Sequence, residues 1–467
     1  MKKSFLKGFL LILFSSTCFA CSNGIEDLVD AGVPIIGSSS ALVAEVKASS
    51  NLLGWGNIGD TTIAVKADKE ILPALTSTKT DLKAITANLE GGFRLLSVGG
   101  SLSAGFRDGG LYREGQLTAF PNLVARQMGV TFYQPLFDAS NGNGSGYKVL
   151  AGTEPIATFK LVTNNLGYVD NAKADKLKPF TGNNIDQYAF PYMNHDLGNQ
   201  GLNENMGKKF SDRFFKNPNQ EAYYNSKVLK NEFCDFFILE AGYDDVVAGI
   251  MAGGGSVLPQ EFFAVTGGGL TIDALANNKA KGVLLNVPDL FDLPYFSQIT
   301  NEKIKKLTGV VIRVQKSYSS EYYRDFNPLI DRLLPTATVE KLMRGEIKGL
   351  ALLSDRDVLS QEEGDSEWNY VKPGAYNDIQ VARKAKANNL AMVDMYNLYK
   401  KILAGTYTTD DGIKVNPDWK TGNFFSSDGI YPTAFGQAVI ANEVIKTMNQ
   451  FYKLTIPLVD TRFFLKK

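Results

Sequence analysis

A single serine on a glycine turn is the strongest candidate for chemistry in this chain. Ser101 follows the apolar run 95–98 and two glycines, in the order Leu-Leu-Ser-Val-Gly-Gly-Ser. A serine on a tight turn after a strand stands at the edge of a sheet with backbone N–H groups around it, which is the setting that a nucleophile needs. Because strand–Gly–Gly–Ser turns are common in proteins, this motif alone leaves a structural role open.

The residues around this serine resemble a known family. Residues 99–105, Gly-Gly-Ser-Leu-Ser-Ala-Gly, are similar to the first sequence block of the SGNH/GDSL hydrolases, Gly-Asp-Ser-Leu-x-Ala-Gly. The continuation, Gly-Leu-Tyr-Arg-Glu-Gly-Gln at 110–116 and Phe-Pro-Asn at 120–122, resembles the envelope lipoprotein branch found in Bacteroidota. The resemblance covers about residues 93–452. It implies an α/β fold, a three-layer α/β/α parallel sheet of the flavodoxin-like kind with loop insertions, and an ester hydrolase site.

Other blocks of the family occur in the expected order. They are Asp-Leu-Gly-Asn-Gln-Gly at 196–201 for the second block, Gly-Tyr-Asp-Asp at 242–245 for the third, and Asp-Gly-Ile-Tyr-Pro at 428–432 for the fifth. The resemblance makes Ser101 the nucleophile and Asp428 the residue that orients the base. It puts Gly201 and Asp244 at the positions of oxyanion donors, beside the Ser101 N–H. Tyr243 borders the site.

Three residues depart from the family pattern. Tyr431 stands where the family has the catalytic histidine, and a neutral phenol with a pKa near ~10 is a poor base at neutral pH. Asp244 replaces an asparagine, and an ionised carboxylate accepts hydrogen bonds but donates none. Gly100 replaces an aspartate that braces the loop. Loss of the base alone costs about 10⁴–10⁶-fold in rate in serine hydrolases.

Two routes to a replacement base remain open in the sequence. His195 is the sole histidine and lies six residues before Gly201, but its neighbours Asn194 and Asp196 favour an ordinary loop histidine or a pocket contact. Direct proton transfer from Ser101 to an aspartate requires that burial or crowding raise the carboxyl pKa. Asp244, Asp245 and Asp428 could crowd in this way, or hold a cation through oxygen ligands; we predict no metal site and no cofactor.

The elements that must position these residues follow an α/β pattern. Apolar runs at 93–98, 236–239, 282–287 and 391–393 predict strands, and the spacing at 120–128 and 434–451 predicts helices. Strands that alternate with helices favour a parallel sheet, whose ligand sites lie at the carboxyl ends of the strands. Cys234 is predicted to be a small core residue, and 141–152 and 361–369 to be surface loops.

The amino terminus predicts an export signal with a lipid anchor. Lys2 and Lys3 precede the short apolar run 9–14, and Cys-Phe-Ala-Cys at 18–21 resembles a bacterial lipobox in which Cys21 is lipidated. Several acyl chains would hold the protein at a membrane without crossing it. We therefore expect an outer-membrane lipoprotein of the cell envelope, its leaflet undetermined. An ordinary cleaved signal peptide is the alternative.

These observations divide the 467 residues into a signal peptide (1–20), a tether and N-terminal decoration (21–92), an SGNH-like domain (93–455) and a C-terminal tail (456–467). Lys plus Arg and Asp plus Glu both number 49, which gives no sign of a nucleic-acid partner. The leading hypothesis is a catalytically degenerate accessory protein, or pseudoenzyme, that binds a lipid, a glycan or an outer-membrane protein. The alternatives are an active serine esterase with a non-histidine or relocated base, and a structural protein whose site is filled.

Overall fold

A parallel β-sheet forms the centre of the molecule. The computed structural model describes residues 57–75, 80–87, 92–153, 157–193, 207–214, 233–251, 267–316, 319–354, 356–362 and 373–465. The sheet has the order β12-β6-β5-β2, and all its pairings are parallel. Its strands are β2 (Leu95–Val98), β5 (Phe236–Glu240), β6 (Lys281–Leu285) and β12 (Ala391–Val393). The α/β class and the four strands predicted from the sequence are thus confirmed, with bounds shifted by one or two residues.

The strand order changes direction at β2. Beyond its free edge, the segment around Gln187 runs parallel to the strand through the bridge Ser97–Gln187. The Ser97 N–H donates to the Asp186 carbonyl, and the Tyr188 N–H donates to the Ser97 carbonyl. The chain therefore passes from β2 to this segment on one side of the strand, and then to β5 on the other side. In an open α/β sheet such a reversal opens a crevice at the carboxyl ends of the strands.

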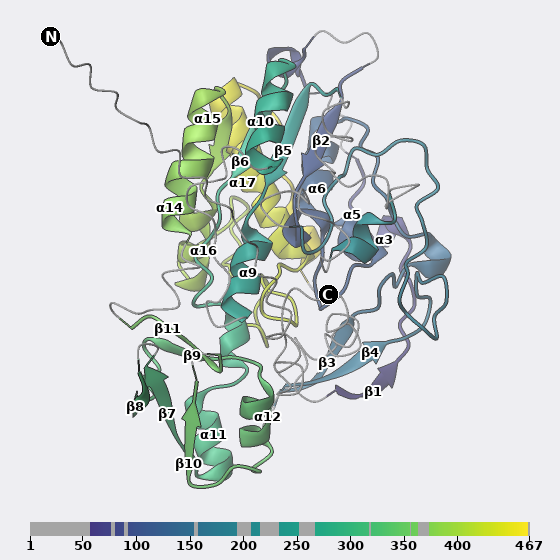
Figure 1. Cartoon of the computed structure of the whole chain (residues 1–467). Helices are drawn as coiled ribbons and strands as arrows, with labels where there is room; N and C mark the ends of the chain where they lie inside the picture. The colour runs from purple at the N-terminus through teal and green to yellow at the C-terminus, as the bar shows by residue number, and fades with distance from the viewer. Residues whose placement is uncertain are drawn as a thin grey trace, which may run out of the picture.

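Helices cover the sheet as Figure 1 shows. The predicted helix at 120–128 is found as α6 (Phe120–Met128), which begins with proline in its first turn and ends at Gly129, where φ is 71°. It packs along α17 (Ala434–Tyr452), and α17 also contacts β12. Among the described residues, the main body also contains the helices α3 (Asp68–Ile71), α4 (Ser101–Ala104), α5 (Arg113–Leu117), α7 (Lys208–Ser211), α9 (Tyr243–Met251), α10 (Gly267–Asn277), α14 (Gly374–Tyr376), α15 (Arg383–Ala387) and α16 (Met395–Leu403). None of the described helices is long and apolar enough to span a bilayer.

A second, smaller hydrophobic core lies within residues 299–358. This separate core was not predicted from the sequence, which placed these residues in one domain, 93–455. Its strands are β7 (Val311–Lys316), β8 (Ser319–Asp325), β9 (Asp331–Leu333), β10 (Leu350–Leu353) and β11 (Val358–Ser360). They form the sheets β10-β7-β8 and β11-β9, and they pack with α11 (Asn301–Thr308) and α12 (Ala337–Met343). Ile312, Val314, Ala351 and Leu353 alternate with more exposed residues, as expected for a sheet that buries one face.

Both ends of the described chain join the main body. β1 (Asn57–Thr61) pairs with β4 (Thr158–Val162), which also pairs with β3 (Lys148–Gly152). Strand β3 corrects the prediction that 141–152 is entirely a loop. Of the other predicted loop, 361–369, residues 363–369 lie outside the described residues. The stretch interpreted as a tail packs on α17, where the Asn442 side chain bonds both the N–H and the carbonyl of Val459. Ile456 and Val459 belong to the main core.

Candidate functional site

Ser101 stands at the carboxyl end of β2, at the point where the strand order reverses. The strand ends at Val98, Gly99 and Gly100 form the turn, and Ser101 begins the short helix α4, which ends at Gly105 with φ of 79°. Asp244, in the first turn of α9, follows the neighbouring strand β5. Two parallel strands thus bring the first and third sequence blocks together, as the resemblance implies.

The Asp244 carboxylate accepts hydrogen bonds from both the backbone and the side chain of Ser101. The Ser101 N–H donates to Asp244 Oδ2 at 2.8 Å, and the Ser101 hydroxyl donates to the same oxygen at 2.9 Å. The Tyr431 hydroxyl donates to the other oxygen, Oδ1, at 2.9 Å. All three groups are buried, and Ser101 has no exposed surface. One buried carboxylate therefore accepts hydrogen bonds from three donors of the predicted site.

In this arrangement the Ser101 N–H, a donor that ester hydrolysis at this serine would need, is already hydrogen-bonded within the protein. In an acyl-transfer reaction the N–H of the nucleophilic serine donates to the negative oxygen of the tetrahedral intermediate. Here that N–H already donates to Asp244 Oδ2, a negative oxygen that belongs to the protein itself. A substrate oxygen would have to displace the carboxylate from this N–H. The negative charge that develops on the substrate oxygen would then lie beside the negative charge of Asp244. If Ser101 were the nucleophile of such a reaction, Asp244 would therefore occupy the position of the oxyanion instead of stabilising the intermediate.

Gly100 makes room for this carboxylate. A Cβ atom at position 100 would lie 2.4 Å from Asp244 Oδ2 and 3.2 Å from the Met193 carbonyl oxygen, and the first distance is far inside van der Waals contact. The glycine and the aspartate therefore fit each other. The brace expected to be lost with the family's aspartate is supplied from another strand, because Glu240 Oε2 accepts the Gly100 N–H at 3.0 Å and the Ser103 hydroxyl at 3.2 Å.

Tyr431 and Asp428 lie together but do not form a base and its orienting partner. The Tyr431 hydroxyl points to Asp244, while Asp428 Oδ1 accepts the backbone N–H groups of Ile430 and Tyr431 at 2.7 and 2.9 Å. Asp428 thereby fixes the turn that leads into α17. Burial, and next the charge of Asp244, raise the pKa of the Tyr431 phenol well above its usual value, so the hydroxyl stays protonated at neutral pH. It is a donor, not a base.

Aromatic residues pack against one another beside the serine. The Phe106 ring meets the rings of Tyr192 and Tyr431 edge to face, with centroids 5.3 Å apart in both pairs. Tyr192 also donates its backbone N–H to Ser101 Oγ at 3.1 Å, and its φ of 64° is unusual for a side chain of this size. Tyr243 is 1% exposed and donates its hydroxyl to the Ile430 carbonyl at 2.8 Å. Tyr243, expected to border a pocket, is thus part of the packing.

Three buried carboxyl groups share this region. Burial, and then the charge of Asp108, raise the pKa of Asp428 to about 6. Burial, and then the charge of Asp244, raise that of Glu240 to about 7. Burial also raises the pKa of Asp244 to about 6, although hydrogen bonds from the Ser101 N–H and from the Tyr431 and Ser101 hydroxyls oppose the increase. At neutral pH Asp244 is therefore mainly ionised and accepts all three hydrogen bonds.

The raised pKa of Asp244 predicts a pH-dependent stability. Its folded-state pKa of about 6 exceeds the ordinary value of 3.8, so the folded chain binds this proton at a higher pH than the unfolded chain does. Its contribution to stability therefore grows as the pH falls from 7.5 towards 5. We expect the unfolding free energy of the wild type, minus that of Asp244→Asn, to increase by about 1 kcal/mol between these pH values. Urea titrations of both proteins measure this difference.

Asp244→Asn is the matched variant because the amide has the same shape. Its oxygen can accept from the Ser101 N–H and hydroxyl, while its NH₂ group donates to the Tyr431 hydroxyl oxygen. With no buried charge, this variant should be at least as stable as the wild type at pH 7.5. Parallel pH profiles for the two proteins would show that Asp244 does not titrate in the folded state between pH 5 and 7.5.

The structure places part of the predicted site. It brings Ser101, Asp244, Tyr431, Asp428 and Tyr243 into one buried cluster, whereas Gly201, His195 and Cys21 lie outside the described residues. Within the described ranges, no three His, Cys, Asp or Glu side chains are arranged to hold a metal ion.

Glu240 belongs to this site but was not predicted from the sequence. A signal for Glu240 was present, since it is a charged residue at the end of the buried run Phe-Phe-Ile-Leu. Nothing in the sequence near Tyr192 predicts the hydrogen bond from its N–H to Ser101. Comparison of the chain with protein-family models, curated proteins and solved structures found no match.

Proposed function

We propose that this chain is an envelope lipoprotein with an SGNH-hydrolase-like fold whose former catalytic centre has become a closed structural unit, and that it acts by binding rather than by turnover. The observation that carries the proposal is the contact of Asp244 Oδ2 with both the N–H and the hydroxyl of Ser101, at 2.8 and 2.9 Å. A site with its own carboxylate in the oxyanion position stabilises its resting state over the charged intermediate of ester hydrolysis.

The three departures from the family pattern support this proposal because they act together. Gly100 leaves the space that the Asp244 carboxylate fills, and Tyr431 donates to its second oxygen. A catalytic centre that decays at random would lose such pairings one by one and leave polar groups unsatisfied. Here each substituted residue satisfies or accommodates another, as a buried polar cluster requires.

The order of the strands is consistent with the proposed family. With the segment around Gln187 placed beyond β2, the chain order across the sheet becomes 2-1-3-4-5, the flavodoxin-like order of doubly wound folds. The cluster lies where such folds bind ligands, at the reversal between β2 and β5. The finer assignment to a three-layer SGNH domain rests on this order together with the sequence resemblance. The lipidated Cys21 rests on the sequence alone.

A serine esterase that uses Asp244 as its base is the second candidate. Its support is the 2.9 Å hydrogen bond from the Ser101 hydroxyl to a carboxylate whose pKa is about 6. The same carboxylate oxygen also accepts the Ser101 N–H, so after taking the proton it would still fill the oxyanion position. The complete burial of Ser101 also speaks against attack on a substrate. Non-hydrolytic binding is therefore the better-supported function.

Reaction with a fluorophosphonate tests the proposal directly. These reagents modify serines that are activated as nucleophiles, and the product is read as a mass increase of the intact protein. We expect no adduct on the purified wild type at pH 7.5 or 8.5, because the Ser101 hydroxyl is buried and hydrogen-bonded to a carboxylate in the oxyanion position. Stoichiometric modification that disappears in Ser101→Ala would overturn the proposal and establish the esterase.

A further inference from the structure

A solvent-open groove lies at the amino ends of the strands, at the opposite edge of the sheet from Ser101. It has a volume of about 1330 Å³. Phe93 and Arg94, which precede β2, and Phe233, which precedes β5, line it together with the turn after α6 and the stretch 80–86. Compact small-molecule pockets span about 300–1,000 Å³. The groove is therefore large enough for an extended ligand.

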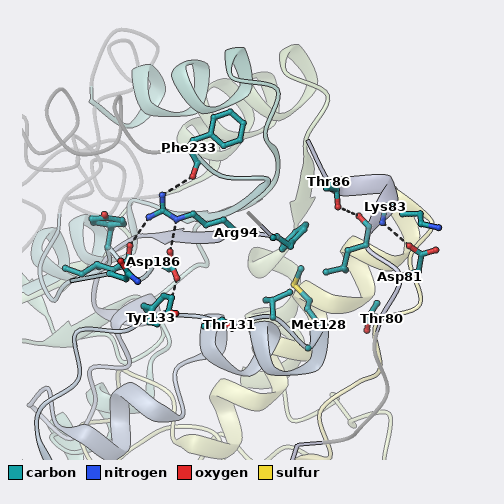
Figure 2. Close-up of a pocket in the computed structure, with 18 of the residues that line it drawn as sticks. Thr80, Asp81, Lys83, Thr86, Arg94, Met128, Thr131, Tyr133, Asp186 and Phe233 are labelled. Carbon is teal, nitrogen blue, oxygen red and sulfur yellow. Dashed lines mark hydrogen bonds and ion pairs between the residues drawn. The ribbon is translucent and has the colours of Figure 1, made fainter. Parts of the chain in front are cut away.

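Two partly exposed aromatic side chains lie on one wall of this groove. Tyr133 is 47% exposed and Phe233 is 38% exposed. Single exposed aromatics need no explanation, but these two line the same groove. Figure 2 shows Arg94 between them. Exposed rings of this kind offer flat apolar surfaces on which a ligand ring can stack.

One ion pair holds both aromatic residues in place. Arg94 Nε donates to Asp186 Oδ1 at 2.9 Å, and its NH1 group donates to the Phe233 carbonyl at 3.0 Å. The other Asp186 oxygen, Oδ2, accepts the Tyr133 N–H at 2.9 Å. The Arg94–Asp186 pair thus connects the backbones of Tyr133 and Phe233. A wall fixed in advance loses little conformational entropy when a ligand binds.

The rest of the groove combines polar residues with apolar ones such as Leu82, Phe93 and Val130, and it is balanced in charge. Asn183, Asn184 and Thr131 contribute exposed amide and hydroxyl groups, and Lys83 and Asp81 contribute one charge of each sign. Arg94 and Asp186 compensate each other. A polyanion would require an excess of cationic groups, and an acyl chain would require a lining that is mainly apolar, whereas here polar and apolar residues alternate around the groove. The groove instead suits a neutral ligand that has both apolar ring faces and many hydroxyl groups.

We infer that this groove binds a neutral glycan, with sugar rings on Tyr133 and Phe233 and hydroxyl groups on the amides and hydroxyls beside them. The inference deepens the proposed function, because it names the ligand class of a binding protein, yet it uses none of the residues around Ser101. The ligand chemistry follows from the aromatic wall, its fixation by Arg94 and Asp186, and the charge balance of the lining.

Native gel electrophoresis in the presence of polysaccharide tests this inference with the full mature chain. The probes are a neutral glucan (dextran), a galactomannan and an arabinoxylan, with dextran sulfate as the charged counterpart of the first. We expect at least one neutral polysaccharide to retard the wild type, and dextran sulfate to have no greater effect. Retardation by none of the three, or by dextran sulfate alone, would overturn the inference.

Variants assign the binding to the groove. Tyr133→Ala and Phe233→Ala should each weaken retardation at least about fivefold in apparent Kd, since each removes one stacking surface. Arg94→Lys should also weaken it, because lysine cannot reproduce the fork of bonds to Asp186 and Phe233. Tyr322→Ala and Phe463→Ala remove aromatics that are 54% and 40% exposed elsewhere, and should bind as the wild type does.

Two readouts keep the outcomes separate. Circular dichroism and thermal unfolding show whether each variant folds, and unchanged retardation in folded Tyr133→Ala and Phe233→Ala would place any glycan outside the groove and reject the inference. Ser101→Ala should be retarded like the wild type. If the wild type reacted with fluorophosphonate and was also retarded in a groove-dependent way, the proposed non-hydrolytic function would fail while the glycan site would stand.

Discussion

The double variant Asp244→Asn/Tyr431→His is expected to turn Ser101 into a reactive nucleophile. The asparagine puts a neutral amide, which the oxygen of the reagent can displace, in place of the carboxylate on the Ser101 N–H, and the histidine supplies a base three residues after Asp428. Losing the base or one oxyanion donor costs serine hydrolases several orders of magnitude, so restoring both should raise the rate of fluorophosphonate modification at least ~100-fold over the wild type. Intact-protein mass spectrometry over time measures this rate.

The single variants are the controls for this gain. Tyr431→His alone leaves the carboxylate on the Ser101 N–H, and Asp244→Asn alone leaves no base, so neither should react appreciably. Adding Ser101→Ala to the double variant should abolish the modification. If the folded double variant were as unreactive as the wild type, the burial of Ser101, and not the presence of Asp244 and Tyr431, would explain why the wild type does not react.

Gly100→Ala is expected to be strongly destabilising. Its Cβ atom would lie 2.4 Å from Asp244 Oδ2 and 3.0 Å from Asp244 Cγ. Either the turn moves, or the carboxylate gives up its bonds to Ser101, and overpacking of this kind costs about 1–3 kcal/mol before any lost hydrogen bond is counted. Urea unfolding followed by circular dichroism measures the loss. Gly374→Ala is the matched control, because a Cβ there meets no atom within 4 Å.

A double-mutant cycle assigns this cost to the pair. In an Asp244→Ala background the atoms that obstruct the new methyl group are absent, so Gly100→Ala should cost at least 1 kcal/mol less than in the wild type, which is about the interaction energy that contacting residues show. Equal costs in both backgrounds would mean that the turn itself, with the nearby Met193 carbonyl, requires glycine.

The sequence predicted the sheet well because its strands have a simple physical signature. The run Phe-Phe-Ile-Leu at 236–239 is buried on both faces, and such strands of parallel sheets are continuously apolar. Helix α6 was readable from its spacing and from the glycine that follows it. The second, smaller core was not readable in the same way, since β7 and β10 expose one face, and β7 and β8 contain charged residues. The segment around Gln187, which is second in chain order across the sheet, forms a single bridge to β2 and has no strand pattern of its own.

The site was predictable as a set of residues but not as an arrangement. The blocks located Ser101, Asp244, Asp428 and Tyr431, and the structure brings them together. The direction of each hydrogen bond could not be predicted, because Asp244 and Ser101 are separated by 143 positions and their contact depends on the register of β2 with β5. For the same reason, Gly100 was interpreted as a loss of support when Glu240 provides that support from the adjacent strand.

The fit between Gly100 and Asp244 also constrains the history of the site. If the ancestral chain carried a side chain at position 100, an aspartate arriving first at 244 in its present orientation would have met that side chain in a buried space. Arrival of the glycine first, by contrast, would have removed an obstruction and left only a small gap. In that case the order of substitutions would not have been free. The glycine would have come before the carboxylate or together with it, and a later return to a side chain at position 100 alone would clash with Asp244.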